Sequence, residues 1–448
     1  MRFTVQRDAL AEAVTWVARA LPTRPVVPVL AGLLLRAERE DHNQSGSNGP
    51  GWLTASCFDY EVSARMRVRA EVAEPGVFLV PGRLLVEIVR SLPAQPVEFG
   101  DDPDGISVTC GEASFAVASL PSGEYPELPE LPQLAGTADG GALATAIGQV
   151  TPAASRDDTL PMLTAVNVEL AGATMTLAAT DRYRLAVREL GWRPAPGFGD
   201  SGRVSLLVPA RTLSDAAKMM SAGTEVAIML RTGVDRAAAD ASGSGAAEAM
   251  IGFDAGERRL TARLLAGEFV RYRSRFPEEF GCTADLPAEA FAEAVRRVAL
   301  VAERGTPVQL TFAPGRVTVG AATQGQARAR ESVPADFSGD EPMIAFSPHY
   351  LLDGVIAATA TAPVPPAPSL APAPATTPAP APAATPAPSP AAAGEPPAGR
   401  GTAGARVRLW FTSPSKPAVI TRQPDQGADG AKGAEGDFRY LVVPQRVQ

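Results

Sequence analysis

The sequence has few residues of the kinds that build catalytic or metal sites. It holds only two histidines, His42 and His349, and three cysteines, Cys57, Cys110 and Cys282. Neither histidine has a second histidine, a cysteine or a spaced carboxylate that would complete a metal site. The cysteines form no CxxC pair, and three distant cysteines fit a reducing compartment better than a disulfide framework. Surface or capping histidines and buried structural cysteines are therefore the favoured interpretation, and we predict no metal and no cofactor.

Long apolar runs and nucleotide-binding signatures are also missing. No stretch approaches the roughly 18 apolar residues that a membrane helix needs, and the start of the chain lacks the pattern of a signal peptide. No GxxxxGK[ST] loop is present, and no GxGxxG lies between a strand and a helix. The segment GDDPDG (100–105) lacks the distal glutamate of a calcium loop and fits a hairpin turn better. We expect a cytoplasmic protein that is neither an enzyme nor a membrane partner.

Positive charge is not in excess either. The 448 residues carry 41 lysines and arginines against 49 acidic residues, a formal net charge of −8. This balance argues against a protein that binds nucleic acid over its whole surface, and it leaves local basic patches open. Hydrophobic residues make up 45% of the chain, which is enough for several separate cores.

The sequence does contain a threefold internal repeat. Segments 8–21, 141–154 and 289–302 share apolar positions at i, i+4 and i+7, the stripe of an amphipathic helix: Leu10, Val14 and Val17, then Leu143, Ile147 and Val150, then Phe291, Val295 and Val298. A second triple, at 80–87, 208–215 and 346–353, aligns Leu85, Leu213 and Leu351 and predicts a second helix in each copy. The chain is therefore predicted to be three copies of one domain.

Short alternating segments lie between these helices and predict strands. They include 26–38, 105–120, 174–180, 225–231, 308–312, 316–323, 406–412, 418–422 and 438–444. Each copy then has two helices on antiparallel sheet, an α+β domain. We place domain 1 at 1–128, domain 2 at 136–277 and domain 3 at 281–448.

Three segments do not belong to the repeat. Residues 40–51 are polar and rich in glycine, and residues 233–250 are rich in alanine, glycine and serine. The longest, at about 361–404, consists almost wholly of proline and alanine and is expected to be a disordered insertion inside domain 3. Folding can tolerate such an insertion because closure entropy grows only logarithmically with loop length.

The segment TDRYRLA (180–186) resembles a signature of the bacterial sliding clamp, the β subunit of DNA polymerase III. The opening MRFTVQRDAL, the linkers LPSGEYPELP (120–129) and GEFVRYRSRFP (267–277), and the ending YLVVPQRV (440–447) match the same family in order. The combination of FDYEVSAR (58–65), RDDTLPML (156–163) and TDRYRLAVRE is similar to actinobacterial clamps in particular. The resemblance covers nearly the whole chain.

This resemblance implies a protomer that dimerises head to tail into a closed ring of six domains around duplex DNA. The partners would be double-stranded DNA held without regard to sequence, DNA polymerases, and subunits of the clamp loader. The DNA-facing residues implied are Arg24, Arg83, Arg211 and Lys218, although ordinary solvated helix faces are the alternative. The subunit contacts implied are Phe115, Val117 and Leu300, for which core packing is the rival interpretation.

A groove between domains 2 and 3 is implied for a partner peptide with apolar anchors. The positions carried over are Leu163, Thr180, Arg182, Tyr183, Arg184, Leu185, Pro277, Leu441, Val442, Val443, Pro444, Gln445 and Arg446. Arg182 and Tyr183 stand where the common pattern has Gly-His, and Gln445 stands where methionine is frequent. Together with the insertion, these departures raise the alternative of a clamp paralogue, an adaptor for repair or specialised polymerases that does not encircle DNA efficiently.

Overall fold

The structure is a computed structural model. It describes residues 1–40, 49–103, 105–198, 202–220, 223–232, 249–303, 305–323, 327–340, 343–360, 404–423 and 437–445. The Pro/Ala-rich segment 361–403, His42 and Arg446 lie outside these residues. The bounds and contacts given below concern the described residues.

Each third of the chain repeats one order of elements: a strand, a helix, four strands, a second helix and three strands. Domain 1 consists of β1 (Arg2–Gln6), α1 (Arg7–Val17), β2 (Gly32–Arg39), β3 (Gly49–Phe58), β4 (Val62–Glu74), β5 (Gly76–Pro81), α2 (Gly82–Ser91), β6 (Pro96–Asp102), β7 (Gly105–Cys110) and β8 (Ala113–Ala118). This order confirms the predicted α+β class.

Domains 2 and 3 follow the same order, each with one extra short strand. Domain 2 consists of β9 (Gln133–Asp139), α3 (Gly140–Val150), β10 (Ala165–Ala171), β11 (Thr174–Thr180), β12 (Arg184–Gly191), the short β13 (Arg193–Pro194), β14 (Val204–Pro209), α4 (Ala210–Ala217), β15 (Glu225–Arg231), β16 (Met250–Ala255) and β17 (Arg258–Arg263). Domain 3 consists of β18 (Cys282–Pro287), α6 (Ala288–Ala299), β19 (Val308–Ala313), β20 (Arg316–Thr323), β21 (Ala327–Pro334), the short β22 (Asp336–Ser338), β23 (Met343–Phe346), α7 (Pro348–Thr359), β24 (Arg406–Phe411), β25 (Ala418–Arg422) and β26 (Phe438–Val442).

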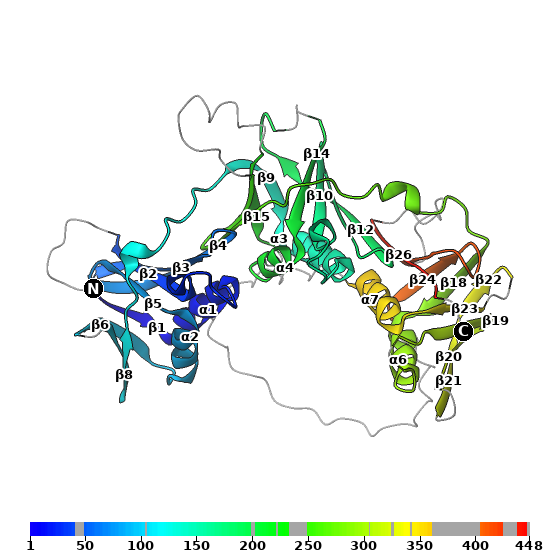
Figure 1. The fold of residues 1–448 in the computed structure, drawn as a ribbon, viewed down its shortest axis with the longest axis horizontal. Helices are drawn as coiled ribbons and strands as arrows, with labels where there is room; N and C mark the ends of the chain where they lie inside the picture. Colours follow the sequence, from blue (N-terminus) through cyan, green and yellow to red (C-terminus); the bar gives the residue numbers. More distant parts are fainter. Residues whose placement is uncertain are drawn as a thin grey trace, which may run out of the picture.

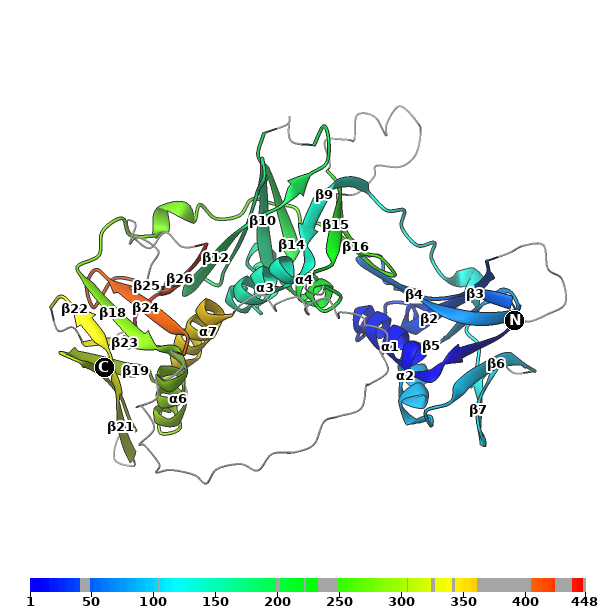
Figure 2. The same ribbon diagram turned by 180° about the vertical axis from the view of Figure 1, so that it is seen from behind.

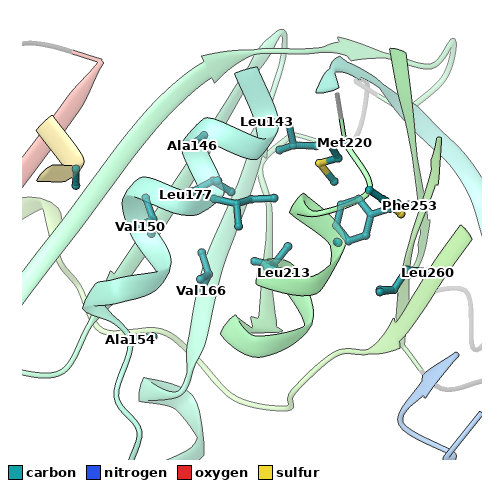
Figure 3. Packing of buried hydrophobic residues seen from close by; sticks show 14 of the residues in the cluster. Leu143, Ala146, Val150, Ala154, Val166, Leu177, Leu213, Met220, Phe253 and Leu260 are labelled. Atoms are coloured by element: carbon teal, nitrogen blue, oxygen red, sulfur yellow. The ribbon is translucent and has the colours of Figure 1, made fainter. Parts of the chain in front are cut away.

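The apolar stripes of the helices form the cores. The nine residues aligned in the first triple of segments are all buried, and so are Leu85, Leu213 and Leu351 of the second. Figure 3 shows Leu143 and Val150 of α3 with Leu213 of α4, packed close to Val166 and Leu177 of the neighbouring strands. Because burial of the helical stripe against the sheet holds each domain together, the repeat in the sequence corresponds to a repeat in the core.

Two strand predictions need correction at their ends. Segment 26–38 was predicted as one strand, but Pro28–Ala31 form a 3-10 turn and β2 begins only at Gly32. Proline fixes the backbone and lacks the N–H that a sheet ladder requires, which favours the turn. Conversely, Gly49 to Gly51, assigned to the polar loop, belong to β3 and pair with β4. β9 also begins at Gln133, before the proposed start of domain 2.

Sheets run across both domain junctions. The fourth strand of domain 1, β4, pairs with the last strand of domain 2, β17, and the fourth strand of domain 2, β12, pairs with the last strand of domain 3, β26. The three domains form a crescent with the sheets outside and α1, α2, α3, α4, α6 and α7 along the concave side (Figure 1). The fourth strand of domain 3, β21, and the last strand of domain 1, β8, are edge strands at opposite tips of the crescent (Figure 1).

None of the helices in the described residues is long and apolar enough to cross a membrane.

Candidate functional site

The pairing of β12 with β26 brings together the two motifs that the sequence singled out. Arg184 lies opposite Val442, and Leu185 lies opposite Leu441. Beyond the ladder, the backbone N–H of Val443 donates to the carbonyl oxygen of Tyr183, with an N···O distance of 2.9 Å. The residues of TDRYRLA and LVVP therefore meet at the junction of domains 2 and 3.

The turn before β12 is held by the side chains of Asp181 and Thr180. The carboxylate of Asp181 accepts hydrogen bonds from the backbone N–H groups of Tyr183 and Arg184, both at 3.0 Å. The hydroxyl of Thr180 accepts from the N–H of Arg182 at 3.1 Å and donates to the carbonyl of Arg184 at 2.6 Å. These bonds fix the backbone of Arg182 at φ +81°, in the left-handed region that favours glycine.

Replacing Arg182 by glycine is expected to stabilise the chain. A residue with a Cβ at positive φ pays about 1 kcal/mol that glycine does not, so Arg182→Gly should raise the free energy of unfolding by up to about that amount in urea denaturation. Arg182→Ala, which removes the long side chain but keeps the Cβ, should show no gain. A lower stability for Arg182→Gly than for Arg182→Ala would contradict this explanation.

Arg184 is the buried centre of a polar cluster that spans the junction. Its side chain is only 6% exposed, and its Nε donates to Asp181 at 2.9 Å. Its guanidinium also forms an ion pair with Asp353 of α7 and lies 4.5 Å from the centre of the Tyr350 ring. Burial alone would lower the pKa of Arg184, but Tyr440, Asp353 and Asp181 raise the pKa above its ordinary value. The cluster therefore ties domain 2 to domain 3.

Aromatic rings extend this cluster to the surface. Tyr183 is 55% exposed, and its ring stacks on Tyr350 with centroids 6.1 Å apart and planes at 17°. The Tyr440 hydroxyl donates to the carbonyl of Tyr350 at 2.9 Å. His349 lies beside Tyr350, with its Nε2 3.4 Å from Asp353. The rings of Tyr183 and Tyr350 are thus partly exposed to solvent and are held in place by the polar cluster around Arg184.

The outer face of the same junction is apolar. Leu185, Leu441, Ala178 and Val187 form a buried cluster that Tyr272 covers, and Phe269, Phe276 and Val443 pack against it. The linker between domains 2 and 3 therefore lies on this cluster. Of the other residues carried over for the groove, Leu163, Thr180 and Val442 are buried, whereas Pro277, Pro444 and Gln445 are partly buried.

A hollow of about 640 Å³ opens on the other side of the turn, between α4, α7 and segment 151–164. It is lined by Arg156, Arg211, His349 and Asp353 among others. Asp353 therefore contacts the buried Arg184 on one side and this hollow on the other. The predicted DNA-facing residue Arg211 lies at the same junction as the predicted peptide groove.

The other residues predicted to face DNA are also exposed, but their partners differ. Arg24 and Arg211 form no ion pair among the described residues, and Arg83 donates only to the carbonyl of Pro22 at 3.3 Å. Lys218, in contrast, is held by Asp215 at 2.6 Å. Arg83, Arg211 and Lys218 lie on or directly after the helices of the concave side (Figure 1). Three cations are thus free to meet an anion, and the fourth is already neutralised.

The three residues predicted for the subunit contact differ in burial. Leu300 directly follows α6 and is 84% exposed, and Phe115 on β8 is partly buried. Val117, on the same strand, is 3% exposed and belongs to the core of domain 1. The side chain of Val117 therefore packs in the core of domain 1, and its backbone lies opposite Ile106 of β7.

Sequence reasoning missed Tyr350, Asp353 and Tyr440 as members of the junction cluster. Asp353 was available as the acidic residue two positions after Leu351, a feature shared with Glu87 and Asp215. No local sequence pattern shows that Asp353 contacts Arg184, which is 169 positions away in the chain. Among the described residues, no group of three or more His, Cys, Asp or Glu side chains could hold a metal ion.

Three repeats of an α+β domain in a crescent, with helices on its concave side and an edge strand at each tip, define the class of sliding clamps. The chain belongs to the DNA polymerase III beta subunit family. Its residues 1–129 match the N-terminal domain of that family, residues 138–270 the central domain and residues 273–363 the C-terminal domain. The family is one of processivity factors rather than catalytic subunits.

Individual relatives agree with this assignment. The beta sliding clamp of Streptomyces coelicolor is 42% identical over 447 residues, covering 100% of both chains. That of Micrococcus luteus is 47% identical over 334 residues, covering 75% of this chain and 99% of the relative. In fold, the chain matches the crystal structure of the DNA polymerase sliding clamp from Bacillus subtilis with a TM-score of 0.74 at 22% identity, covering 100% of both. The predicted resemblance to actinobacterial clamps is thereby confirmed.

Proposed function

We propose that the chain acts as a head-to-tail homodimer that encircles duplex DNA and tethers DNA polymerases by a peptide docked at the junction of domains 2 and 3. A closed ring retains DNA by topology, so its inner surface needs only diffuse contact with phosphates and no base readout. The family assignment supports processivity as the role; the ring, its DNA contacts and the peptide site are proposals for this chain.

The repeated junction is the observation that carries the ring. Within the chain, the fourth strand of one domain pairs with the last strand of the next in both β4·β17 and β12·β26. Two strands have no such partner within the described part of the chain: β21, the fourth strand of domain 3, and β8, the last strand of domain 1. Each is an edge strand. Pairing β8 of one copy with β21 of another repeats the junction a third time, and two such contacts close a ring of two copies.

The helices support the same arrangement. At the junction of domains 2 and 3, the end of α3 packs against α7, and the side-chain amide of Gln149 donates to the carbonyl of Ala357 at 2.8 Å. The end of α6 is the equivalent position in domain 3, and there Leu300 is exposed. In the ring, Leu300 would pack against α2 of the next copy, near Phe115. An exposed leucine at this position is then part of an interface rather than an unexplained apolar residue.

Contact with DNA is expected from the free cations of the concave side. Each arginine that neutralises one phosphate contributes about 0.9 to the slope of log K against log salt concentration. Arg24→Ala and Arg211→Ala should each lower that slope by roughly this amount when duplex DNA binding is titrated between about 50 and 200 mM salt. Lys218→Ala is the matched control with a smaller change, because Asp215 already holds the ammonium group. Equal slopes in all three variants would contradict the assignment.

Peptide docking is expected where Val443, Tyr183 and Tyr350 meet. Val443 is partly buried against the apolar cluster of Leu185 and Leu441, so a carboxylate there is placed among apolar groups. Val443→Glu should weaken binding of a short peptide with two leucine or phenylalanine anchors by roughly 30-fold or more in fluorescence anisotropy. Val26→Glu, at a valine that is 94% exposed in domain 1, is the control and should bind as the unaltered chain. Equal binding by both variants would exclude this site.

A second candidate function is an adaptor derived from a clamp, which keeps the peptide site without encircling DNA. The observation that favours it is the turn itself, in which Arg182 stands at a position suited to glycine and Tyr183 stacks on Tyr350. A chain that stays monomeric in solution and still binds the apolar peptide would support the adaptor over the ring.

A further inference from the structure

The junction of domains 1 and 2 repeats the local geometry of the peptide junction. The carboxylate of Asp59 accepts from the N–H groups of Glu61 and Val62 at 3.0 and 2.8 Å, as Asp181 does in the turn before β12. Tyr60 has φ +73°, and it and Arg182 are the two non-glycine residues at positive φ among the described residues. The N–H of Arg263 donates to the carbonyl of Glu61 at 2.9 Å, which repeats the bond from Val443 to Tyr183.

The side chains on the outer face of this junction are polar where those of the peptide junction are apolar. The cross-strand pair Ser63–Thr261 of this junction is equivalent in register to the pair Leu185–Leu441 of the peptide junction. The pair Ser56 and Arg65 occupies the place of Ala178 and Val187. The same backbone frame therefore carries buried apolar side chains at one junction and, at the other, buried hydroxyl groups beside the partly exposed Arg65.

Arg65 is the centre of this surface. Arg36, Arg67 and Arg259 surround it, and each has a carboxylate partner: Glu38 at 3.9 Å, Glu257 at 3.9 Å and Asp254 at 2.7 Å, respectively. Among the described residues, Arg65 itself has no ion pair. Burial, followed by the charges of Arg259 and Arg67, holds the pKa of Arg65 below its ordinary value. Arg65 is thus surrounded by arginines, and of the nearby carboxylates Glu38 acts on its charge without forming an ion pair with it.

Polar atoms without partners gather at the same place. Seven side-chain nitrogen or oxygen atoms in the described part of the chain are buried without a hydrogen-bond partner, and four of them lie on this face: Thr54 Oγ1, Arg65 Nε, Arg67 Nε and Thr261 Oγ1. Buried polar groups in folded proteins are normally paired, and each unpaired group costs about 1–3 kcal/mol. Their concentration on one face marks a polar, incompletely paired layer beneath the partly exposed arginine side chains.

We propose that this surface, the Arg65 face, made of the partly exposed Arg65, Arg67 and Arg259 above the buried Ser56, Ser63 and Thr261, is a second docking site that binds an extended acidic segment of a partner protein. The proposal rests on the proposed peptide site, whose frame the Arg65 face repeats. Carboxylates match it because guanidinium groups bind them through paired, charge-assisted hydrogen bonds. Arg65 and Arg67 alternate along β4 at about 6.6–6.8 Å, the spacing of alternate side chains in an extended peptide.

An acidic segment would add to the affinity of a partner already held by its apolar anchors. Both junctions involve domain 2, whose β17 belongs to the 13-stranded sheet and whose β12 belongs to the 9-stranded sheet. Both sheets lie on the outside of the crescent (Figure 2), so a single partner chain that follows this side can contact both junctions. A second weak contact on a tethered partner acts at high effective concentration. The Arg65 face would therefore select partners that carry negative charge beside their anchor peptide.

The test uses the full-length chain and a fluorescein-labelled (Glu-Ser)5 peptide, with binding followed by anisotropy at low salt. Arg65→Met keeps the apolar length of the side chain and should weaken binding about tenfold, the loss of one charge-assisted contact. Arg69→Met is the matched control on the same strand and face, because Arg69 is already paired with Glu40 and stacked on Trp52 at 3.9 Å. Arg259→Met, which removes the partly exposed arginine opposite Arg65, should also weaken binding and serves if Arg65→Met does not fold.

Three results would overturn the proposal: no binding of the peptide to the unaltered chain, equal binding by Arg65→Met and Arg69→Met, or tighter Arg65-dependent binding of a dT10 oligonucleotide than of the peptide. The last would assign the face to nucleic acid. The apolar anchor peptide is titrated on the same proteins. Its binding should be unaffected by Arg65→Met, and its failure to bind the unaltered chain would reject the proposed function rather than the Arg65 face.

Discussion

Arg184→Met is expected to lower the free energy of unfolding by about 3–5 kcal/mol, measured by urea denaturation. The substitution removes the cation that Asp181 and Asp353 share. Both carboxylates are then partly buried negative charges without their positive partner. Because the cluster joins β12 to α7, the loss should be greatest for the contact between domains 2 and 3. Hydrogen exchange should show increased opening of β26 before that of β1.

Arg188→Met is the control on the same strand. Arg188 is partly exposed and reaches Asp437 only at 4.0 Å, so its loss should change the stability by less than about 1 kcal/mol. Similar destabilisation by both substitutions would mean that the cluster around Arg184 is no more important than a surface ion pair.

The second large effect is expected at the edge strand β8. Gly111 and Glu112 form the two-residue turn of the β7–β8 hairpin, so Cys110 and Ala113 are the hydrogen-bonded pair that closes it. Hydrogen-bonded and non-hydrogen-bonded pairs alternate, which directs the N–H of Ala116 away from β7 and toward the open edge. Ala116→Pro should therefore leave the hairpin intact but remove a donor from the proposed contact with β21, and convert the dimer into monomers at micromolar concentration.

Ala116→Ser keeps the backbone N–H and should remain dimeric. Size-exclusion chromatography with light scattering distinguishes the two states, and a thermal scan checks that Ala116→Pro is folded. A folded Ala116→Pro variant that dimerises as tightly as Ala116→Ser would show that β8 does not pair with another copy.

The sequence was sufficient for the parts of the fold that repeat. The helices and most strands are where the apolar periodicity placed them, because each stripe is buried against its own domain. The family resemblance places Val117 at the subunit contact by its position alone, and only the structure shows that its side chain packs in the core of domain 1. The turn preference at Pro28 also overrode the strand pattern of its neighbours.

The candidate site was predicted only through the family resemblance. Arg184 and Tyr440 are 256 positions apart, and the Pro/Ala-rich insertion lies between them in the chain. No local pattern reveals that β12 and β26 pair, or that Asp353 supplies the counterion. The Arg65 face illustrates the same limit, because its arginines look like an ordinary solvated strand until the register with β17 places Arg259 beside Arg65.

Retention on circular DNA tests the central claim of a closed ring most directly. Labelled protein is loaded onto nicked circular duplex by the clamp loader of its own organism, the complex is isolated by gel filtration, and the circle is then cut once. The ring predicts that protein stays with the circle through gel filtration and is lost when the circle is linearised. Protein that is never retained, or that remains equally bound after linearisation, would contradict the ring.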